Sequence, residues 1–397
     1  MGYSDRDNRR VKIHIDLAAM RHNLNRACLA APGKKTFCVV KSDAYGHGLQ
    51  KVVPALRQSD GYAVANVQEG LAVRNQEGRK PVLVLQGFQS TAELRDCIRA
   101  NLWPVIHHAE QLTMFARNDL ATLGCWVKFD TGMGRLGFEP ADAPGICRQL
   151  AEKSVRVIGI MTHLASADRL RDMSTDRQLK VFRSLQWPDI VDYSVANSAA
   201  LLTRHDSHYD WIRPGIMLYG ANPMDAIIDG NMLDSAGPPL EPNSGPDGRD
   251  FALQPAMRVS APVIAVRNFK RGDRIGYAGT YECTGPTKVA VVGAGYGDGY
   301  PRRVPPGTCV MLGDRRCPIL GRVSMDSMSV DVTGLSVVPP LDYPVTLWGH
   351  SGLRVDEIAR RIGTIPYELL CGIRGKRSWL DPSPGTNVTS ISDDKSV

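Results

Sequence analysis

A lysine stands where an apolar stretch of the sequence gives way to a short glycine-rich segment. Residues 36–40 are apolar and rich in β-branched side chains, the pattern of a buried strand, and Lys41 follows them directly. An ammonium group is costly at the end of a buried strand unless it is paired or has lost its proton. A neutral lysine amine is the form that joins an aldehyde cofactor such as pyridoxal phosphate (PLP) as a Schiff base. By itself, the segment 39–48 suits this chemistry and a lysine that merely reaches the rim of a barrel equally well.

Further polar residues follow the ends of later apolar runs. In chain order they are Lys41 and Tyr45, then Lys128, Asp130 and Arg135, then His163, then Asn197 and Ser198, and then Arg213 with Gly215. Each has an ordinary structural role on its own: His163 as a core histidine, Arg213 in an ion pair, Ser198 as a helix N-cap. Their shared position at run ends, around a lysine, favours a functional site. The segments 197–200 and 214–216 add small residues, backbone N–H groups and hydroxyls, which suit a phosphate group.

The elements that would carry these residues alternate between strand and helix. Apolar runs of strand length stand at 36–41, 61–67, 81–86, 102–107, 126–130, 155–163, 192–197 and 212–218. The segments between them are helical in pattern, as in 17–27 and 174–185. Eight such units over about 210 residues predict a parallel (β/α)8 barrel of the TIM type, in which the chemistry sits at the C-terminal ends of the strands. A doubly wound open sheet has the same alternation and stays as the competing topology.

The second half of the chain has a different pattern. Residues 222–254 are rich in Gly, Pro, Asp, Asn and Ser, and we interpret them as a linker. Short alternating strands with tight turns follow at 257–266, 288–292, 308–312, 318–320, 327–332 and 345–348, and a helical segment at 354–362. We therefore predict a PLP-binding barrel over 11–240, which includes an opening strand at 11–17, and a mostly-β C-terminal domain over 255–380. The polar end, 381–397, is predicted to be a disordered tail.

Composition and charge restrict the class of protein. The chain has 397 residues, a net charge of +7 and 43% hydrophobic residues, which suits a two-domain globular protein. Its basic residues are scattered in short groups without interleaved aromatics, so we expect no nucleic-acid partner. No stretch has the apolar length of a membrane span or the pattern of a signal peptide, and the nine cysteines contain no CxxC pair, so we expect a cytoplasmic protein with no membrane contact. No HExxH, zinc-spaced cysteine or Walker A pattern occurs, and we expect no metal.

Several motifs, taken in order, give the chain a resemblance to a known family. They are VVKSDAYGHG (39–48), KFDTGMGRLGF (128–138), MTHLASAD (161–168), ANSAAL (196–201), DWIRPGIMLYG (210–220), RIGYAGTY (274–281), GYGDGYPRR (295–303) and GRVSMDSMSVD (321–331). With these motifs the chain resembles the alanine racemases, PLP enzymes built from a barrel and a β-domain. The resemblance runs from about residue 11 to 371, and several ordered motifs are far more specific than any one of them.

The resemblance implies a two-base racemisation of alanine. Lys41 matches the lysine that holds PLP and serves as one base, and Tyr277 matches the tyrosine that serves as the opposite base. In the family that tyrosine reaches the site from the second subunit of a homodimer, which makes a homodimer the expected assembly. One base on each face inverts the centre without turning the substrate over. His163 and Arg213 match the residues thought to give the tyrosine cationic support, and Arg213 would face the pyridine nitrogen. Because a guanidinium keeps its protons, that nitrogen would stay unprotonated, which favours racemisation over transamination.

The remaining implied roles follow motif by motif. The residues that match cofactor-binding positions are Lys41, Tyr45, His163, Asn197, Ser198, Arg213, Gly215 and Ile216. Those that match substrate-binding or entrance positions are Arg135, Tyr296, Met325 and Asp326, the last three supplied in the family by the partner subunit. Lys128 matches a lysine that is carbamylated in some members, where the carbamate charge steadies the arginine. The expected product, D-alanine, suits peptidoglycan synthesis for the cell wall.

Two departures from the family pattern leave other functions open. The join at 222–254 is longer than usual, and the segment 371–380 lacks the Arg-Val-Pro pattern common there, so no pocket tyrosine can be assigned. A racemase of broader specificity, for example for serine or basic amino acids, is therefore an alternative. A PLP-dependent decarboxylase of the same barrel type would lack Tyr277 in this context, and a PLP-binding protein without catalysis would lack the β-domain.

Overall fold

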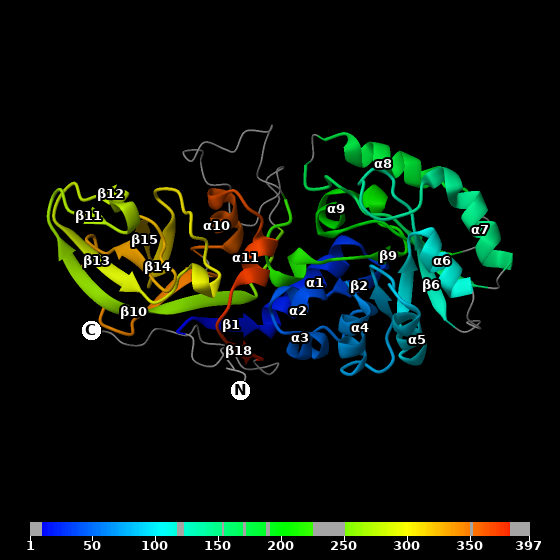
Figure 1. Ribbon diagram of the computed structural model, residues 1–397, viewed down its shortest axis with the longest axis horizontal. Coiled ribbons are helices and arrows are strands. Elements are labelled where there is room, and N and C mark those ends of the chain that lie inside the picture. Colours follow the sequence, from blue (N-terminus) through cyan, green and yellow to red (C-terminus); the bar gives the residue numbers. More distant parts are fainter. Residues whose placement is uncertain are drawn as a thin grey trace. The chain divides into compact units, whose positions relative to one another are not determined.

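The computed structural model describes residues 10–116, 123–152, 155–169, 172–187, 191–224, 251–349 and 352–381 (Figure 1). Among these residues the chain forms two compact units. One comprises 20–224 together with 251–253, and the other comprises 10–19 together with 254–381. Most of the predicted linker and the predicted tail beyond residue 381 lie outside the described residues.

The first unit is a closed barrel of eight parallel strands. They are β2 (Lys35–Val39), β3 (Gly61–Val64), β4 (Val82–Val84), β5 (Trp103–Ile106), β6 (Gly124–Lys128), β7 (Arg156–Met161), β8 (Asp192–Ser194) and β9 (Trp211–Ile212). The last strand closes the barrel because Lys35 and Thr36 of β2 pair in parallel with Trp211 and Ile212 of β9. Each strand falls on one of the eight apolar runs, so the predicted barrel is confirmed and the open sheet is excluded.

Aromatic rings fill part of the barrel interior. Phe37 of β2 stacks on Trp211 of β9 with ring centroids 3.9 Å apart, and it meets Trp126 of β6 edge-on at 5.8 Å. Because β2 and β6 are not neighbouring strands, these rings can meet only inside the barrel. The edge-to-face arrangement of Phe37 and Trp126 is a favourable one for aromatic pairs. The rings are buried, and they hold opposite walls of the barrel together.

Helices follow the strands around the barrel. They are α1 (Leu17–Ala30), α2 (Lys41–Tyr45), α3 (Leu49–Ala55), α4 (Val67–Arg74), α5 (Thr91–Arg99), α6 (Ala109–Ala116), α7 (Ala143–Glu152), α8 (Ser174–Arg183) and α9 (Ser198–Thr203). Four of them begin at a side-chain cap, since Asp16, Asn66, Ser90 and Asn197 each accept the backbone N–H three residues on. The helices predicted around 17–27 and 174–185 are confirmed as α1 and α8.

The second unit is built on an eight-stranded sheet, in the order β13-β16-β15-β14-β17-β10-β1-β18. The strands are β1 (Lys12–Asp16), β10 (Met257–Phe269), β13 (Thr287–Val292), β14 (Cys309–Leu312), β15 (Arg315–Leu320), β16 (Met328–Asp331), β17 (Pro344–Trp348) and β18 (Lys376–Leu380). A small hairpin, β11 (Arg274–Ile275) and β12 (Tyr281–Glu282), and two helices, α10 (Val355–Ile362) and α11 (Pro366–Gly372), complete it. The six strands and the one helix predicted here are confirmed, as is the mostly-β character of the unit.

The first strand of the chain belongs to this second sheet. β1 pairs antiparallel with β10, where Lys12 lies opposite Ser260, and parallel with β18, where Lys12 lies opposite Lys376. The sequence pattern predicts a strand at 11–17 but contains nothing that identifies its partners. The strand β18, at the end of the described chain, was not predicted at all.

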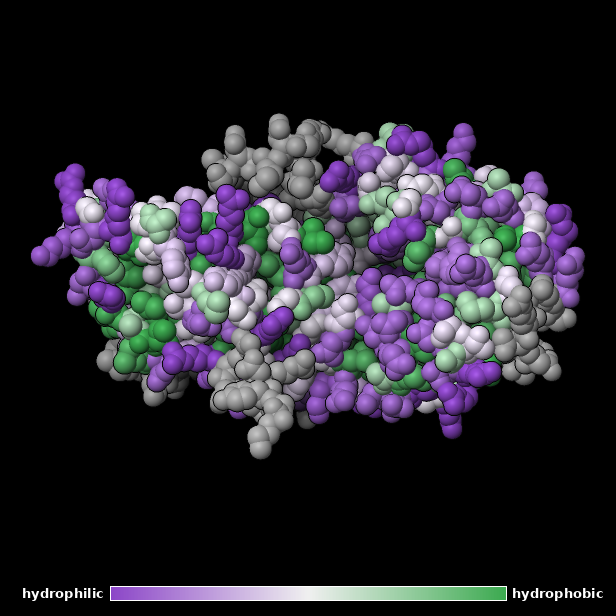
Figure 2. Space-filling view, viewed as in Figure 1, coloured by the Kyte–Doolittle hydropathy of each residue, from purple (hydrophilic) through white to green (hydrophobic). Residues whose placement is uncertain are grey.

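The surface hydropathy and the helix lengths give little information about which partners the protein binds. On the face shown in Figure 2, hydrophilic side chains spread over both units, with smaller apolar areas between them. Within the described ranges, every helix is too short or too polar to cross a membrane. Nor do the described residues include a cluster of His, Cys, Asp or Glu side chains suited to a metal ion.

Candidate active site

The polar residues predicted from the barrel motifs lie at the C-terminal ends of its strands. Lys128 is the last residue of β6, and it pairs with Met161 at the end of β7, which in turn pairs with Ser194 at the end of β8. Lys41 lies two residues after the end of β2, and Arg213 lies directly after the end of β9. Because the strands are parallel, these ends meet at one mouth of the barrel. The structure therefore brings together residues that are up to 172 positions apart in the chain.

Arg213 is the buried cation of this mouth. Its side chain is 3% exposed, and its guanidinium donates to Ser194 Oγ, to Thr162 O at 2.7 Å and to Val195 O at 3.1 Å. Burial lowers the pKa of Arg213 to about 10, which still leaves the guanidinium charged at neutral pH. Among the described residues, no hydrogen bond is formed by its Nε–H. That donor is available to a ligand.

His163 lies against Arg213 and is neutral. Its Nδ1 is 3.4 Å from Arg213 Nη2. Burial first, and then the positive charges of Arg213 and Lys128, lower the pKa of His163 well below its ordinary value. With Arg213 donating to Nδ1, the ring proton of a neutral His163 resides on Nε2.

Lys128 is a second buried base beside this pair. It is 7% exposed, and burial, followed by the charges of Arg213 and Arg135, lowers its pKa to about 8. The nearby carboxylate of Asp130 opposes this shift only in part. A large share of Lys128 amines is therefore uncharged at a pH just above neutrality.

A compact loop after β6 positions Arg135. The carboxylate of Asp130 accepts the N–H groups of Gly132 at 2.9 Å, Met133 at 2.7 Å and Arg135 at 2.8 Å. These three bonds outweigh the effect of burial, so the pKa of Asp130 lies below its ordinary value. Gly137 closes the loop at φ +135°, where a Cβ would stand 2.4 Å from the Asp130 nitrogen. Only glycine therefore allows the chain to return along β6 at this point.

Hydroxyl and amide donors converge after β8 and β9. Ser198 Oγ accepts the N–H of Gly215 at 2.8 Å and lies 3.4 Å from the Met217 nitrogen. A Cβ on Gly215 would stand 2.7 Å from the hydroxyl of Tyr45, so glycine keeps the space in front of that hydroxyl open. The Tyr45 ring itself stacks on Tyr219, with centroids 4.6 Å apart. Two hydroxyls and several backbone N–H groups thus share one small space, which suits a phosphate group.

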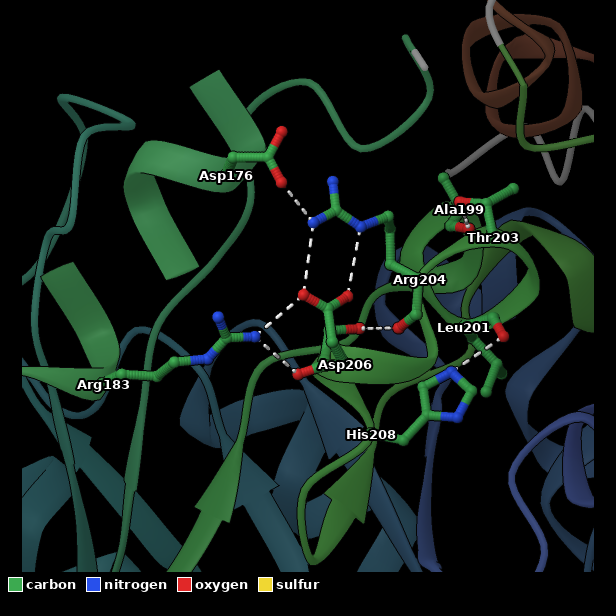
Figure 3. Close-up of polar contacts among 9 residues, drawn as sticks. Asp176, Arg183, Ala199, Leu201, Thr203, Arg204, Asp206 and His208 are labelled. Atoms are coloured by element: carbon green, nitrogen blue, oxygen red, sulfur yellow. Dashed lines mark hydrogen bonds and ion pairs between the residues drawn. The ribbon is translucent and has the colours of Figure 1, made fainter. Parts of the chain in front are cut away.

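The far end of α9 is held by an ion-pair network on the barrel surface (Figure 3). Arg204, just after α9, donates to Asp206 at 3.1 Å and to Asp176 of α8 at 2.5 Å, and Arg183 of α8 meets Asp206 at 2.8 Å. Burial alone would raise the pKa of Asp206, but the hydrogen bonds from Arg204 and Arg183 lower it on balance. The network ties α9, which starts at Ser198, to the helix before it.

The segment after Lys41 has a left-handed backbone. Ser42, Asp43, Ala44 and Tyr45 have φ angles of 56°, 53°, 55° and 52°. The turn is closed by backbone bonds from Ala44 N to Val40 O at 2.9 Å and from Gly46 N to Ser42 O at 3.0 Å. Lys41, half-buried, stands at the start of this turn, and Tyr45 stands at its end.

The other predicted site residues lie in the second unit, in or beside the loop 321–327. Tyr277 heads a 3₁₀ turn (Tyr277–Gly279) between β11 and β12, and its side chain is 62% exposed. Tyr296 begins another such turn, and the loop 321–327 touches both: Ser324 O accepts the Tyr296 N–H at 3.0 Å, and Arg322 lies against Gly276. Met325 O accepts the N–H of Gly297 at 2.8 Å, so Met325 and Asp326 lie beside the Tyr296 turn.

Some supporting residues were not recognised from the sequence. Thr162 and Val195 bind Arg213 through backbone carbonyls, which leave no trace in the residue type. Ser194 is a polar residue inside the apolar run 192–197, and only the structure shows that β8 ends there. Asp130 was noticed at a run end without a role, although an Asp two residues before a Gly-x-Gly segment is a common loop-closing signal.

Comparison with known proteins gives one family throughout. The family model for the alanine racemase N-terminal domain matches residues 15–223, and that for the C-terminal domain matches residues 256–378. An alanine racemase of Thioalkalivibrio sulfidiphilus is 44% identical over 373 residues, which cover 93% of this chain and 98% of that protein. The solved biosynthetic alanine racemase of Pseudomonas aeruginosa has a TM-score of 0.85 at 38% identity and covers 94% of this chain and 100% of its own. An alanine racemase structure from Bartonella henselae, with covalently bound pyridoxal phosphate, has a TM-score of 0.80 at 26% identity. The match covers 93% of this chain and 99% of that protein.

The neutral state of His163 predicts a pH dependence of stability. A histidine whose folded-state pKa is lowered contributes stability that is present above the unfolded pKa of about 6.5 and is lost as the pH falls below it. Replacing His163 with Gln should therefore reduce the loss of stability between pH 7.5 and 5.5, by at most about 1.4 kcal/mol. Urea denaturation at the two pH values measures this. His205→Gln, at an exposed histidine, is the control, and equal losses in both variants would contradict the assignment.

Proposed function

The chain belongs to the alanine racemase family, a family of PLP-dependent isomerases, and on that basis we propose how its own residues interconvert L- and D-alanine. The observation that carries the proposal is the joint placement of Lys41, Arg213, His163 and the Ser198–Gly215 pair at one mouth of the barrel. The mouth of the barrel thus combines a lysine amine, a buried cation and a set of hydroxyl and amide donors.

These groups fit PLP by the chemistry of their donors. Lys41 is a primary amine that can join the aldehyde carbon. The hydroxyls of Tyr45 and Ser198 and the N–H groups of Gly215 and Ile216 would hold the phosphate, in a space that a Cβ on residue 215 would fill. Asn197 supports this loop by capping α9 through the Ala200 N–H at 3.0 Å. His163 would pack against the ring.

Two bases of different type would move the proton. When bound, PLP withdraws electron density from Cα of the amino acid joined to it, which makes the α-proton acidic. Lys41 Nζ exchanges a proton on one face of Cα, and the hydroxyl of Tyr277 exchanges one on the other. Removal from one face and return to the opposite face inverts the centre in either direction.

Arg213 would decide where the proton returns. Its Nε–H has no hydrogen-bond partner in the described part of the chain, and we assign it to the pyridine nitrogen. Because Arg213 keeps its protons, it would donate a hydrogen bond to that nitrogen and would not protonate it. The proton therefore returns to Cα, and racemisation is favoured over transamination.

The substrate carboxylate would be bound by Arg135 together with groups of the second unit. Arg135 is held at its backbone by Asp130, which leaves its guanidinium exposed toward solvent. The Met325 backbone and Asp326 would complete this contact, and Tyr296 would narrow the entrance. A carbamate on Lys128 would give Arg135 a negatively charged partner and hold it in place.

We propose a homodimer in which each site takes Tyr277, Tyr296, Met325 and Asp326 from the partner. The exposure of three large side chains on adjoining loops supports this, since Tyr277 is 62%, Met325 54% and Tyr296 39% exposed. Aromatic residues and methionine are enriched in subunit interfaces. On this proposal the barrel, whose strands lie between Lys35 and Ile212, binds PLP, and the β-domain supplies the second base.

In the cell, the enzyme would supply D-alanine for peptidoglycan. We place it in the cytoplasm, where its nine cysteines, all free thiols, suit a reducing compartment. Broader specificity and decarboxylation are not favoured, because the relatives named above are alanine racemases over nearly their whole length.

The reaction is tested by exchange in heavy water. Incubation of the holoenzyme with L-alanine in D₂O should give D-alanine with deuterium at Cα, as measured by NMR and chiral chromatography. Lys41→Ala and Tyr277→Phe should each lower the rate by at least 100-fold, because each removes one general base. Absence of exchange by the unaltered enzyme would refute the assignment, and parallel reactions with serine, lysine and arginine measure its specificity.

The shared site is tested by mixing two inactive variants. If Lys41 and Tyr277 act together across the dimer, a one-to-one mixture of Lys41→Ala and Tyr277→Phe subunits should regain about a quarter of the unaltered activity. Half of the dimers would be mixed, and each mixed dimer would have one intact site. Mixing Lys41→Ala with a Lys41→Ala/Tyr277→Phe double variant is the control. No recovery after subunit exchange would show that both bases belong to one chain.

Carbamylation of Lys128 should depend on pH. Only the neutral amine reacts with CO₂, and with a pKa of about 8 the neutral fraction rises as the pH increases from 7 to 9. At constant dissolved ¹³CO₂, the carbamate signal in the ¹³C NMR spectrum should therefore grow over this range. Lys128→Gln should abolish the signal and raise KM for alanine, because Arg135 loses its partner. A signal that persists in this variant would place the carbamate elsewhere.

A further inference from the structure

The turn that follows Lys41 is strained. Four successive residues without a glycine occupy the left-handed region, where each L-residue costs about 1–2 kcal/mol. Such strain persists only where the surrounding structure holds it. Part of the support comes from Asp43, whose carboxylate accepts the N–H of Leu49 at 2.8 Å and so fixes the end of the turn.

The start of the turn is held from the neighbouring βα unit by Glu69. One carboxylate oxygen of Glu69 accepts the N–H of Ser42 at 2.7 Å, and the other accepts the N–H of Ala65 at 2.8 Å. Glu69 is half-buried in the first turn of α4, and its own N–H is bound by the N-cap residue Asn66 at 3.0 Å. A single carboxylate thus joins the loop after β2 to the loop after β3.

The next βα unit contains the same arrangement without the link. Glu93 has the same place in α5: its N–H is bound by the N-cap Ser90, and its carboxylate accepts the N–H of Gln89 at 2.7 Å. What distinguishes Glu69 is the additional bond to Ser42. Helix capping therefore accounts for the bonds that Glu69 and Glu93 form at the start of their own helices. It does not account for the bond between Ser42 and Glu69.

We propose that Glu69 is a positioning residue for Lys41. This inference rests on the proposed function, in which Lys41 is one of two bases. The Ser42 N–H belongs to the peptide that joins Lys41 to Ser42, so the Glu69 carboxylate fixes the plane of that peptide and with it the direction of the lysine side chain. Charge-assisted hydrogen bonds to a carboxylate are the stronger ones. A loss of this bond lets the turn relax and moves the lysine amine relative to Cα of the substrate.

The test is Glu69→Gln, with Glu93→Gln as the matched control. Gln has the same shape, but its amide can accept only one of the two N–H groups, and it presents N–H to the other. We expect kcat/KM for alanine to fall roughly tenfold in both directions, which corresponds to about 1.4 kcal/mol. Glu93→Gln should change it less than twofold.

Isotope effects distinguish a misplaced lysine from a general loss of structure. With alanine deuterated at Cα, Glu69→Gln should raise the primary isotope effect on kcat/KM in the direction where Lys41 removes the deuteron. It should lower the isotope effect in the other direction, where Lys41 only returns a proton. A smaller folded fraction would lower the rates and leave both isotope effects unchanged. If Glu69→Gln yields no folded protein, Glu69→Asp, which is too short to reach both N–H groups, should show the same opposite changes.

Three outcomes would overturn the inference. In the first, the kcat/KM of Glu69→Gln changes as little as that of Glu93→Gln. In the second, both variants of Glu69 lose activity with unchanged isotope effects, and the role of Glu69 is then purely structural. If the unaltered enzyme itself exchanges no α-proton, the proposed function fails and this inference fails with it. Exchange by the unaltered enzyme together with unchanged isotope effects in the variants overturns the role of Glu69 alone.

Discussion

The burial of one guanidinium at the mouth of the barrel is the interaction on which the rest of the site depends. A buried N–H group without a partner costs about 1–3 kcal/mol, more when it is charged. Arg213 reduces this cost because the ends of β7 and β8 deliver oxygens from Thr162, Ser194 and Val195 at hydrogen-bonding distance. The eight-stranded closure of the barrel is what brings these strand ends together.

Burial, and after it the charge of Arg213, set the protonation of its neighbours. Together they keep His163 neutral and lower the pKa of Lys128 to about 8. A site with several basic side chains therefore contains fewer positive charges than its composition indicates. This distribution suits an enzyme that needs one permanent cation near the cofactor ring and one lysine amine able to exchange a proton.

Backbone geometry also positions the functional side chains of the site. The left-handed turn after Lys41 ends at Tyr45, whose hydroxyl lies over Gly215, so the lysine and the proposed phosphate site are linked by one short rigid segment. Gly137 and Asp130 likewise fix the short loop that carries Arg135. In each case main-chain hydrogen bonds fix the backbone of the segment that carries the functional side chain.

The sequence by itself was sufficient for the order of the barrel strands and for the polar residues that follow them. Apolar runs mark all eight barrel strands, because a strand buried on both faces must be apolar throughout, and Lys41, Lys128 and Arg213 stand out as charges at the ends of such runs. It contained no signal for the left-handed turn, since Ser-Asp-Ala-Tyr has no glycine, nor for the carbonyls that bind Arg213, since every residue has one. Only the tertiary structure decided that Glu69 reaches Ser42, and that β1 pairs with β10 and β18, more than 240 residues away. Local residue patterns determine which segments are buried, whereas hydrogen bonds between distant backbone groups depend on where the fold brings those groups.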